Sequence, residues 1–196
     1  MLDPALVADL LGVGFEYRAG LGTFGDRSGR YEIAGYFNRD TQSIGVSQRF
    51  SAITVRFTAA HEIGHWALHR HLTELDLLHR DRPISGLAAD AGRPRLEREA
   101  DYFAACLLMP PNLVTKEFGR RFLRAPFVFD DASTFYFRPD DPECLLRPYE
   151  GSLDRETVLA TARSFNTVPF EPLHQRFKVS ITSMTIRLKE LGLIVD

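Results

Sequence analysis

The chain has 196 residues, of which 44% are hydrophobic and 26% charged; these proportions are typical of a folded soluble protein and exclude a disordered one. Its 24 basic and 26 acidic residues leave a formal net charge of -2, which gives no reason to expect nucleic acid or an anionic membrane as the main partner. The two cysteines are too few for a disulfide framework, and no apolar run approaches the ~20 residues that span a bilayer. We therefore expect a cytoplasmic protein that does not contact a membrane.

The predicted elements begin with a short amphipathic helix near the N-terminus, capped by Asp3 and with Pro4 in its first turn. The acidic residues Asp3 and Asp9 argue against interpreting this segment as a secretory signal. Two short strands are expected next, at residues 31–37 and 42–47, because their composition favours strands and a polar turn separates them.

Two strong helices follow these strands. The first is expected from near Arg56 or Phe57 to about Arg70, since it contains no proline and Gly64 is its only glycine. The second is expected over residues 95–109, where it is stopped by two consecutive prolines. A polar loop that contains several Gly and Pro residues connects them.

The second half of the chain gives mixed signals up to about residue 152. Five aromatic residues favour short strands there: Phe127, Phe129, Phe135, Tyr136 and Phe137. Three further helices are expected, at residues 154–165, 170–177 and 181–191, the last with Gly192 as its C-cap. This order of elements predicts an α+β fold in three parts, at residues 1–111, 112–152 and 153–196.

The first strong helix carries His61-Glu62-Ile63-Gly64-His65, a match to the HExxH motif. Residues i and i+4 of a helix lie on one face, about 6 Å apart along its axis, so both imidazoles can bind one metal ion. Glu62 points about 100° away from His61 and can take a proton from the attacking water. The expected metal is zinc, and manganese or another divalent ion is an alternative. A chance arrangement on a surface helix is the competing interpretation, and a third ligand argues against it.

Two residues compete to be that third ligand. Glu97 lies on the second strong helix, where small residues permit close approach to the first helix and where Asp101, one turn further on, can orient a ligand imidazole. The rival is His71, which extends HExxH towards the metzincin pattern. That pattern needs a glycine at position 68 to break the helix, and this chain has Leu68 there. We therefore favour Glu97, with Asp101 as its neighbour near the metal.

Other polar residues of this region are given no metal role. Glu99 points about 200° away from Glu97 on the same helix, so we expect it not to ligate. The remaining histidines of the region are interpreted as solvated surface residues: His69, His71 and His79. Tyr102 and His69 are conceivable electrophiles for a reacting carbonyl, and nothing in the sequence selects either.

The segments from Phe57 to His65 and from Glu97 to Pro110 together resemble the ImmA/IrrE family of metallopeptidases. The resemblance covers about residues 30–110 and implies a gluzincin-like fold with Glu97 as third ligand. It also implies a cytoplasmic endopeptidase that cuts a helix-turn-helix repressor and thereby switches on a stress, mobile-element or phage programme. Many members of the family carry Asn where this chain has Asp101, a change that keeps an acceptor and adds a charge near the metal.

The segment from Pro172 to Leu191 resembles a helix-turn-helix with its turn at Val179 and Ser180. It carries four cations with acidic residues nearby, which is a small footprint for phosphate contacts: Arg176, Lys178, Arg187 and Lys189. A helical scaffold for the peptidase is therefore favoured over a DNA-binding module.

The competing function is a non-proteolytic repressor- or DNA-binding regulator with a structural or vestigial metal site. A structural zinc site usually has four protein ligands, whereas three are evident here. The sequence therefore favours a catalytic site with an open coordination position.

Overall fold

The computed structural model describes residues 2–26, 29–69, 78–80 and 94–195. They form a mixed α+β fold, as predicted, and the chain divides into two compact units, Met1–Leu108 and Met109–Asp196. Within the described ranges, none of the helices combines the length and the apolar character that crossing a membrane requires. Most of the predicted polar loop before Pro94 lies outside the described residues, and its described part, Leu78–Arg80, forms a short strand.

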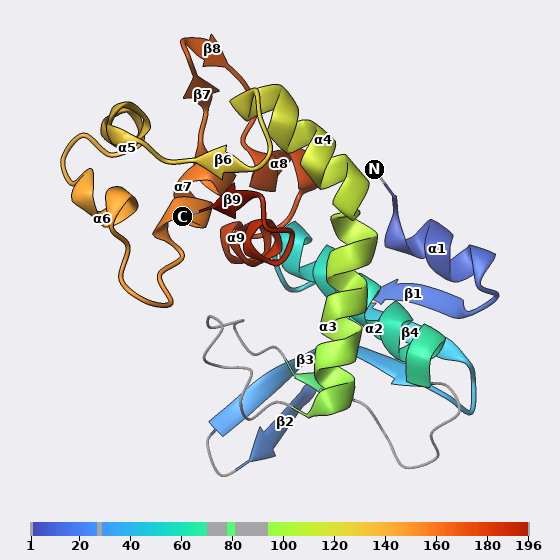
Figure 1. Ribbon diagram of the computed structural model, residues 1–196. Helices are drawn as coiled ribbons and strands as arrows, with labels where there is room; N and C mark the ends of the chain where they lie inside the picture. The colour runs from blue at the N-terminus through green and yellow to red at the C-terminus, as the bar shows by residue number, and fades with distance from the viewer. Residues whose placement is uncertain (1, 27–28, 70–77, 81–93, 196) are drawn as a thin grey trace. The chain divides into compact units, whose positions relative to one another are not determined.

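The first unit combines a mixed sheet with helices. Its elements are α1 (Pro4–Leu10), β1 (Gly14–Arg18), β2 (Thr23–Asp26), β3 (Gly29–Asn38), β4 (Ser43–Ser47), α2 (Ala52–His69), β5 (Leu78–Arg80) and α3 (Arg95–Leu108) (Figure 1). The strand order is β1-β4-β3-β2, and β5 also pairs with β3. Strand β1 runs parallel to β4, and the other pairs are antiparallel.

Two local predictions for this unit are confirmed, and the start of one helix is corrected. Asp3 caps α1, because its Oδ1 accepts a hydrogen bond from the amide of Ala5 at 3.1 Å. The predicted hairpin is β3 and β4, paired with Asn38 opposite Ser43. Helix α2 begins at Ala52 rather than near Arg56, and Ser51 Oγ accepts the amide of Thr54 at its start.

Packing in the first unit places α2 against β3 and β4, and α3 against α2 (Figure 1). The core consists of apolar side chains from α1, the residue before β1, the sheet and α2: Ala8, Val13, Phe37, Ile44, Val46, Ala59, Ile63 and Trp66. Two glycines let the backbones approach closely. A Cβ on Gly35 of β3 would lie 2.5 Å from Thr58 Cγ2, and one on Gly64 of α2 would lie 3.2 Å from Ala100 Cα. These contacts bring the HExxH segment close to both the sheet and α3.

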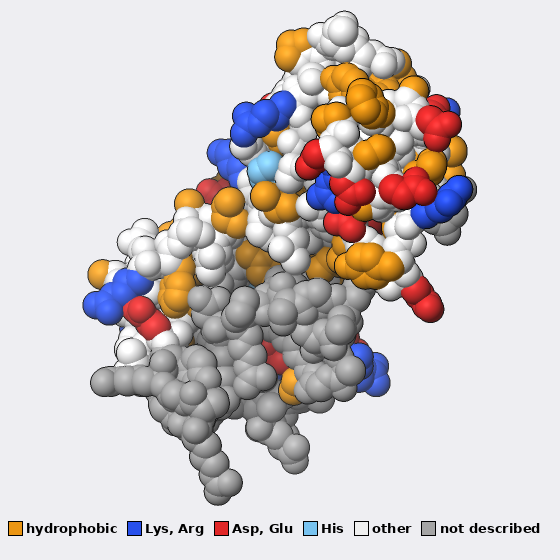
Figure 2. Space-filling model, turned by 90° about the vertical axis from the view of Figure 1, so that its left-hand side faces the viewer, with side chains coloured by type: hydrophobic (Ala, Val, Ile, Leu, Met, Phe, Trp, Pro, Cys, Tyr) orange, Lys and Arg blue, Asp and Glu red, His pale blue; other side chains and the backbone are white. Residues whose placement is uncertain are grey.

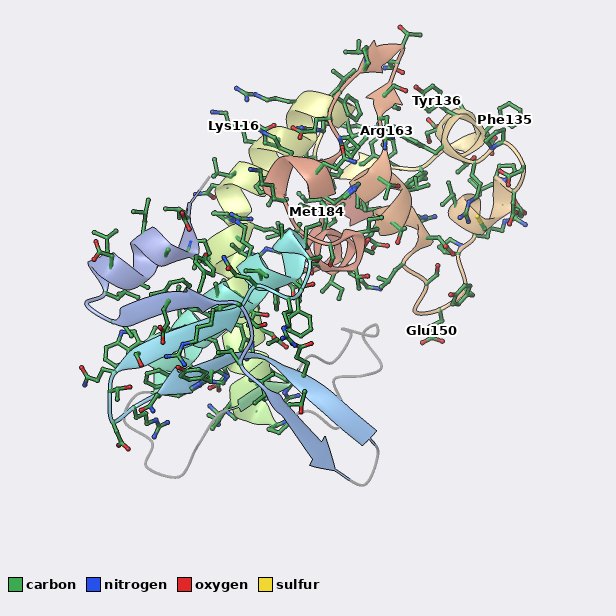
Figure 3. All side chains as sticks on the ribbon, turned by 180° about the vertical axis from the view of Figure 1, so that it is seen from behind. Lys116, Phe135, Tyr136, Glu150, Arg163 and Met184 are labelled. Atoms are coloured by element: carbon green, nitrogen blue, oxygen red, sulfur yellow. The ribbon has the colours of Figure 1, made fainter. Side chains whose placement is uncertain are left out.

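The second unit is built mainly of helices. Its elements are α4 (Pro111–Phe122), β6 (Phe127–Val128), α5 (Asp131–Phe137), α6 (Glu143–Leu146), α7 (Asp154–Thr161), β7 (Ser164–Phe165), β8 (Val168–Pro169), α8 (Leu173–Phe177), α9 (Ile181–Glu190) and β9 (Ile194–Val195). Residues 112–152 and 153–196, predicted as separate parts, both lie within it. Met184 of α9 is buried, whereas Phe135 and Tyr136 project from α5 (Figure 3).

The strand prediction for Phe135, Tyr136 and Phe137 is wrong, because these residues lie in helix α5. The helix begins with a capping box: Asp130 Oδ1 accepts the amide of Ser133 at 2.8 Å, and Ser133 Oγ accepts the amide of Asp130 at 2.9 Å. This start signal outweighs the strand preference of the three aromatic residues. Phe127 does lie in a strand, β6.

The predicted helix over 154–165 ends early, at Thr161. Ser164 and Phe165 instead form β7, which pairs with β8 around a tight turn. Asn166 and Thr167 occupy this turn with φ of 47° and 67°, the positive values that a two-residue hairpin turn requires.

The two C-terminal helices are shorter than predicted, the first at its start and the second at its end. Helix α8 begins at Leu173, directly after Pro172, and α9 ends at Glu190. The C-cap of α9 is Leu191, one residue before the predicted Gly192, and Gly192 follows it with a φ of 59°, in the left-handed region that glycine favours. Residues 178–180 connect the two helices.

Candidate metal centre

The two histidines of the HExxH motif converge on the inner face of α2. His61 and His65 are buried, and their Nε2 atoms lie 2.9 Å apart. The rings meet edge to face, with centroids 4.6 Å apart. Their convergence follows from the helix itself, because one turn separates the two positions.

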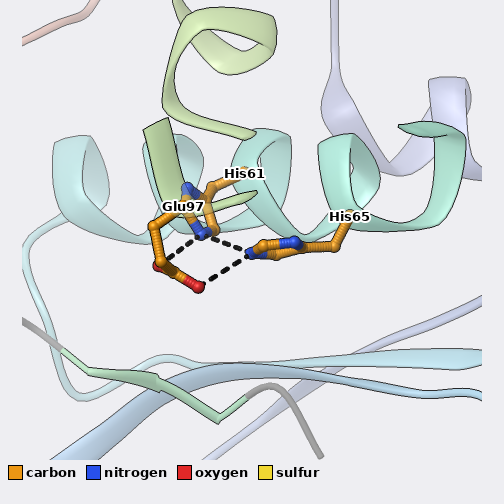
Figure 4. A group of neighbouring side chains, drawn as sticks. All are labelled: His61, His65 and Glu97. Carbon is orange, nitrogen blue, oxygen red and sulfur yellow. Dashed lines mark hydrogen bonds and ion pairs between the residues drawn. The ribbon is translucent and has the colours of Figure 1, made fainter. Parts of the chain in front are cut away.

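Glu97 enters the site from the first turn of α3. Its Oε2 lies 3.4 Å from His61 Nε2, and its Oε1 lies 3.3 Å from His65 Nε2 (Figure 4). One ligand atom from each of the three residues lies within 4.8 Å of the others. The structure thus brings together the three residues that the sequence predicted as ligands.

Asp101 lies one turn beyond Glu97 on α3 and contacts the other nitrogen of His61. The distance between Asp101 Oδ1 and His61 Nδ1 is 2.8 Å, within hydrogen-bonding range. In the neutral imidazole, a carboxylate at this place holds the His61 proton on Nδ1, which makes Nε2 the nitrogen that can bind a metal.

Glu62 is buried on the side of α2 that faces strand β3. A Cβ on Gly35 would lie 3.1 Å from Glu62 Oε1, so this strand passes close to the carboxylate. Neither carboxylate oxygen of Glu62 has a hydrogen-bond partner among the residues that the structure describes. Burial of a carboxylate disfavours its charged form when no hydrogen bond compensates the loss of water.

Burial and neighbouring charges shift the pKa values of these groups. Burial raises the pKa of Glu62 to about 8. Burial lowers the pKa of His61, but hydrogen bonds to Asp101 and Glu97 outweigh this effect and raise it to about 9. Burial lowers the pKa of His65. Burial raises the pKa of Glu97, yet the hydrogen bonds from the two histidines hold it well below its usual range.

His69 is not the solvated residue that the sequence suggested, because only 2% of it is exposed. Its Nδ1 lies 3.0 Å from His65 Nδ1, and its Nε2 lies 3.0 Å from Glu99 Oε2. Glu99, as predicted, does not join the three ligand candidates. The signal that could have found His69 is its spacing: it follows His65 by one turn, as His65 follows His61.

Three other residues were weighed as ligands, electrophiles or surface residues. Tyr102 of α3 is 58% exposed. His71 lies outside the described residues, and His79 belongs to β5, where the structure describes only the backbone.

The donor set fits a zinc ion. Two imidazole nitrogens and one carboxylate oxygen are the protein ligands found in catalytic zinc sites, which keep a further position open. The buried Glu62 carboxylate, one position after His61 in α2, adds the proton acceptor that such a site uses. These features define a candidate metallopeptidase centre of the HExxH class.

Comparison with known sequences supports this class. Residues 23–122 match the peptidase family described as the IrrE N-terminal-like domain. Because the match covers half of the chain and includes both α2 and α3, the chain belongs to this ImmA/IrrE family. No curated protein matches the chain significantly.

Proposed function

We propose that this protein is a zinc-dependent endopeptidase with a gluzincin-like core. The observation that carries the proposal is the convergence of His61, His65 and Glu97, from two helices far apart in the sequence, on one point. Membership of a peptidase family supports the same conclusion.

In this proposal the three converging side chains hold the metal through His61 Nε2, His65 Nε2 and one oxygen of Glu97. A bound zinc ion supplies Lewis-acid chemistry: it lowers the pKa of a water molecule towards ~7 and polarises a peptide carbonyl. Asp101 keeps the His61 ring in the orientation that its role requires.

Glu62 is the proposed general base. Its oxygens are buried and accept no hydrogen bond from any described residue, so they are placed to accept the proton of the attacking water. The protonated carboxyl can then deliver that proton to the amine that leaves when the peptide bond breaks. The raised pKa of Glu62, about 8, suits a group that must both take and return a proton near neutral pH.

The proposed substrate is a helix-turn-helix transcriptional repressor, so that cleavage would act in transcription regulation or a stress response in the cytoplasm. This part of the proposal rests on the resemblance to the ImmA/IrrE family. Direct DNA binding has less support. Arg187, one of the four C-terminal cations, is buried and donates to the carbonyl oxygen of Met109 and to Glu190. On the face in Figure 2, Lys and Arg side chains are interspersed with Asp and Glu.

The test compares the wild-type protein with Glu62→Gln, both loaded with zinc. Each is incubated with a library of proteome-derived peptides and with purified helix-turn-helix repressors, and new N-termini are identified by mass spectrometry. We expect wild-type protein to cut a repressor at a defined bond and Glu62→Gln to lose about 10²–10⁴-fold in rate while it keeps one zinc ion per chain.

The matched control is Glu150→Gln, which changes an exposed glutamate and should cut like wild type. Normal cleavage by Glu62→Gln would refute the proposed base. Zinc binding without cleavage of any substrate, together with salt-sensitive DNA binding, would favour the non-proteolytic regulator instead.

A further inference from the structure

A chain of hydrogen bonds leads away from His65 on the side opposite the three ligand atoms. His65 Nε2 faces His61 and Glu97, whereas His65 Nδ1 lies 3.0 Å from Nδ1 of His69. From His69 the chain continues through Nε2 to Glu99 Oε2 at 3.0 Å. Arg95 Nε donates to the other oxygen of Glu99 at 2.6 Å and ends the chain at the surface.

The direction of these bonds follows from the role of His65. An imidazole that binds a cation through Nε2 must carry its proton on Nδ1 and needs an acceptor there. The atom placed to accept is Nδ1 of His69, which must then be unprotonated. With Nδ1 as the acceptor, the Nε2–H of His69 is the group that donates to Glu99. Each hydrogen bond from His65 through His69 to Glu99 thus has one donor and one acceptor.

His69 is held in place from both sides. Its side chain is buried, and its ring lies 5.2 Å from the ring of His65 between centroids. Arg39, just after strand β3, donates from Nη2 to the backbone carbonyl of His69 at 2.9 Å and anchors the end of α2. Because both ring nitrogens of His69 are engaged, it is free neither to ligate a metal nor to donate to a substrate carbonyl.

We propose that His69 and Glu99 are positioning residues that orient His65 for metal binding, as Asp101 orients His61. The two imidazole ligands then have different supports: a carboxylate contacts His61 directly, whereas a histidine stands between His65 and its carboxylate. This inference rests on the proposed metal site and extends it to residues outside the HExxH motif.

The experiment measures zinc affinity by competition with a chromogenic chelator. His69→Leu keeps a similar volume and removes the acceptor, so we expect zinc affinity to fall by about 10–100-fold. His69→Asn keeps an oxygen near the place of Nδ1, because both groups branch from Cγ, and should retain most of the affinity. The neighbouring Leu68, which is 41% exposed, supplies the control Leu68→Ala, expected to bind zinc like wild type.

A double-mutant cycle tests the order of the chain. Glu99 acts only through His69, so Glu99→Ala should weaken zinc binding a few-fold in the wild-type background and not at all in the His69→Leu background. Thermal unfolding of each variant in chelator shows whether the metal-free protein is folded. If His69→Leu does not fold, the other two variants test the proposal. A loss of zinc affinity in Glu99→Ala together with retained zinc affinity in His69→Asn supports it.

Several outcomes would overturn it. A folded His69→Leu that binds zinc as tightly as wild type shows that the acceptor does not matter. Equal loss in His69→Asn and His69→Leu shows that a hydrogen-bond acceptor is not what the position supplies. Failure of the wild-type protein itself to bind one zinc ion would instead refute the metal site of the proposed function, so the two failures are distinguishable.

Discussion

Asp101 Oδ1 and His61 Nδ1 lie 2.8 Å apart, so one helix supports the histidine of another through a single carboxylate contact. Glu97, on the same helix as Asp101, reaches Nε2 of the same ring. Helix α3 therefore contacts both nitrogens of His61, and any displacement of α3 changes the proposed ligand and its support together.

We predict that Asp101→Ala lowers zinc affinity by about 10–100-fold, because His61 loses the acceptor that orients its ring. Asp101→Asn keeps an acceptor oxygen without the charge and should give an intermediate affinity. Chelator competition measures both values. Asp140→Ala, at an exposed position of the second unit, is the control, and an Asp101→Ala protein with wild-type affinity would contradict the orienting role.

Stability of the metal-free protein should depend on pH through Glu62. Its pKa is about 8 in the folded protein against an ordinary value of 4.5, so the folded state binds the extra proton between these limits. The contribution of Glu62 to the free energy of unfolding is therefore fully present below pH 4.5 and is lost as pH rises towards 8. Glu62→Gln removes this dependence. Its free energy of unfolding in chelator should equal that of wild type near pH 4.5 and exceed it by up to about 4 kcal/mol at pH 8.

Denaturant unfolding at several pH values measures this difference, and Glu150→Gln should follow wild type throughout. If Glu62→Gln is more stable than wild type by the same amount at pH 5 and at pH 8, Glu62 is not protonated on folding.

Zinc binding should release protons at pH 7. His61, with a pKa of about 9, and Glu62, with a pKa of about 8, both carry a proton before the metal arrives. A ligand imidazole and a general base must both lose it, so wild type should release roughly two protons per zinc and Glu62→Gln roughly one. Calorimetry in buffers of different ionisation enthalpy measures the number. Equal release by the two proteins would be inconsistent with a protonated Glu62.

A side chain at position 35 should disturb the contact between the sheet and α2. The Cβ of Gly35→Ala would lie 2.5 Å from Thr58 Cγ2, so the helix must move, and we expect a loss of about 1–3 kcal/mol in the free energy of unfolding. Thr58→Ser removes the methyl group involved and should recover part of the loss in the double variant. Urea unfolding of the four proteins measures the coupling, and strictly additive losses would rule out this clash.

Features that depend on neighbours in the sequence could be predicted from the sequence alone. One helical turn separates His61 from His65, so any helix over this segment brings their rings together. The cap of α1 by Asp3 and the hairpin of β3 and β4 are equally local. The ligand role of Glu97 could be proposed from its place on a helix with small residues, but its approach to both rings depends on how α3 packs against α2.

Only the tertiary structure decided the environment of residues whose partners are distant in the sequence. The position of His69 in the sequence does not reveal that it contacts Glu99 and Arg39, because these residues come from α3 and from the turn just after β3. The burial of Glu62 likewise depends on packing, because strand β3 passes close to its carboxylate, which Gly35 permits. The sequence by itself thus determined the metal motif, since helix geometry is local. Packing between elements decided which polar groups support that motif, since burial arises from contacts between segments far apart in the chain.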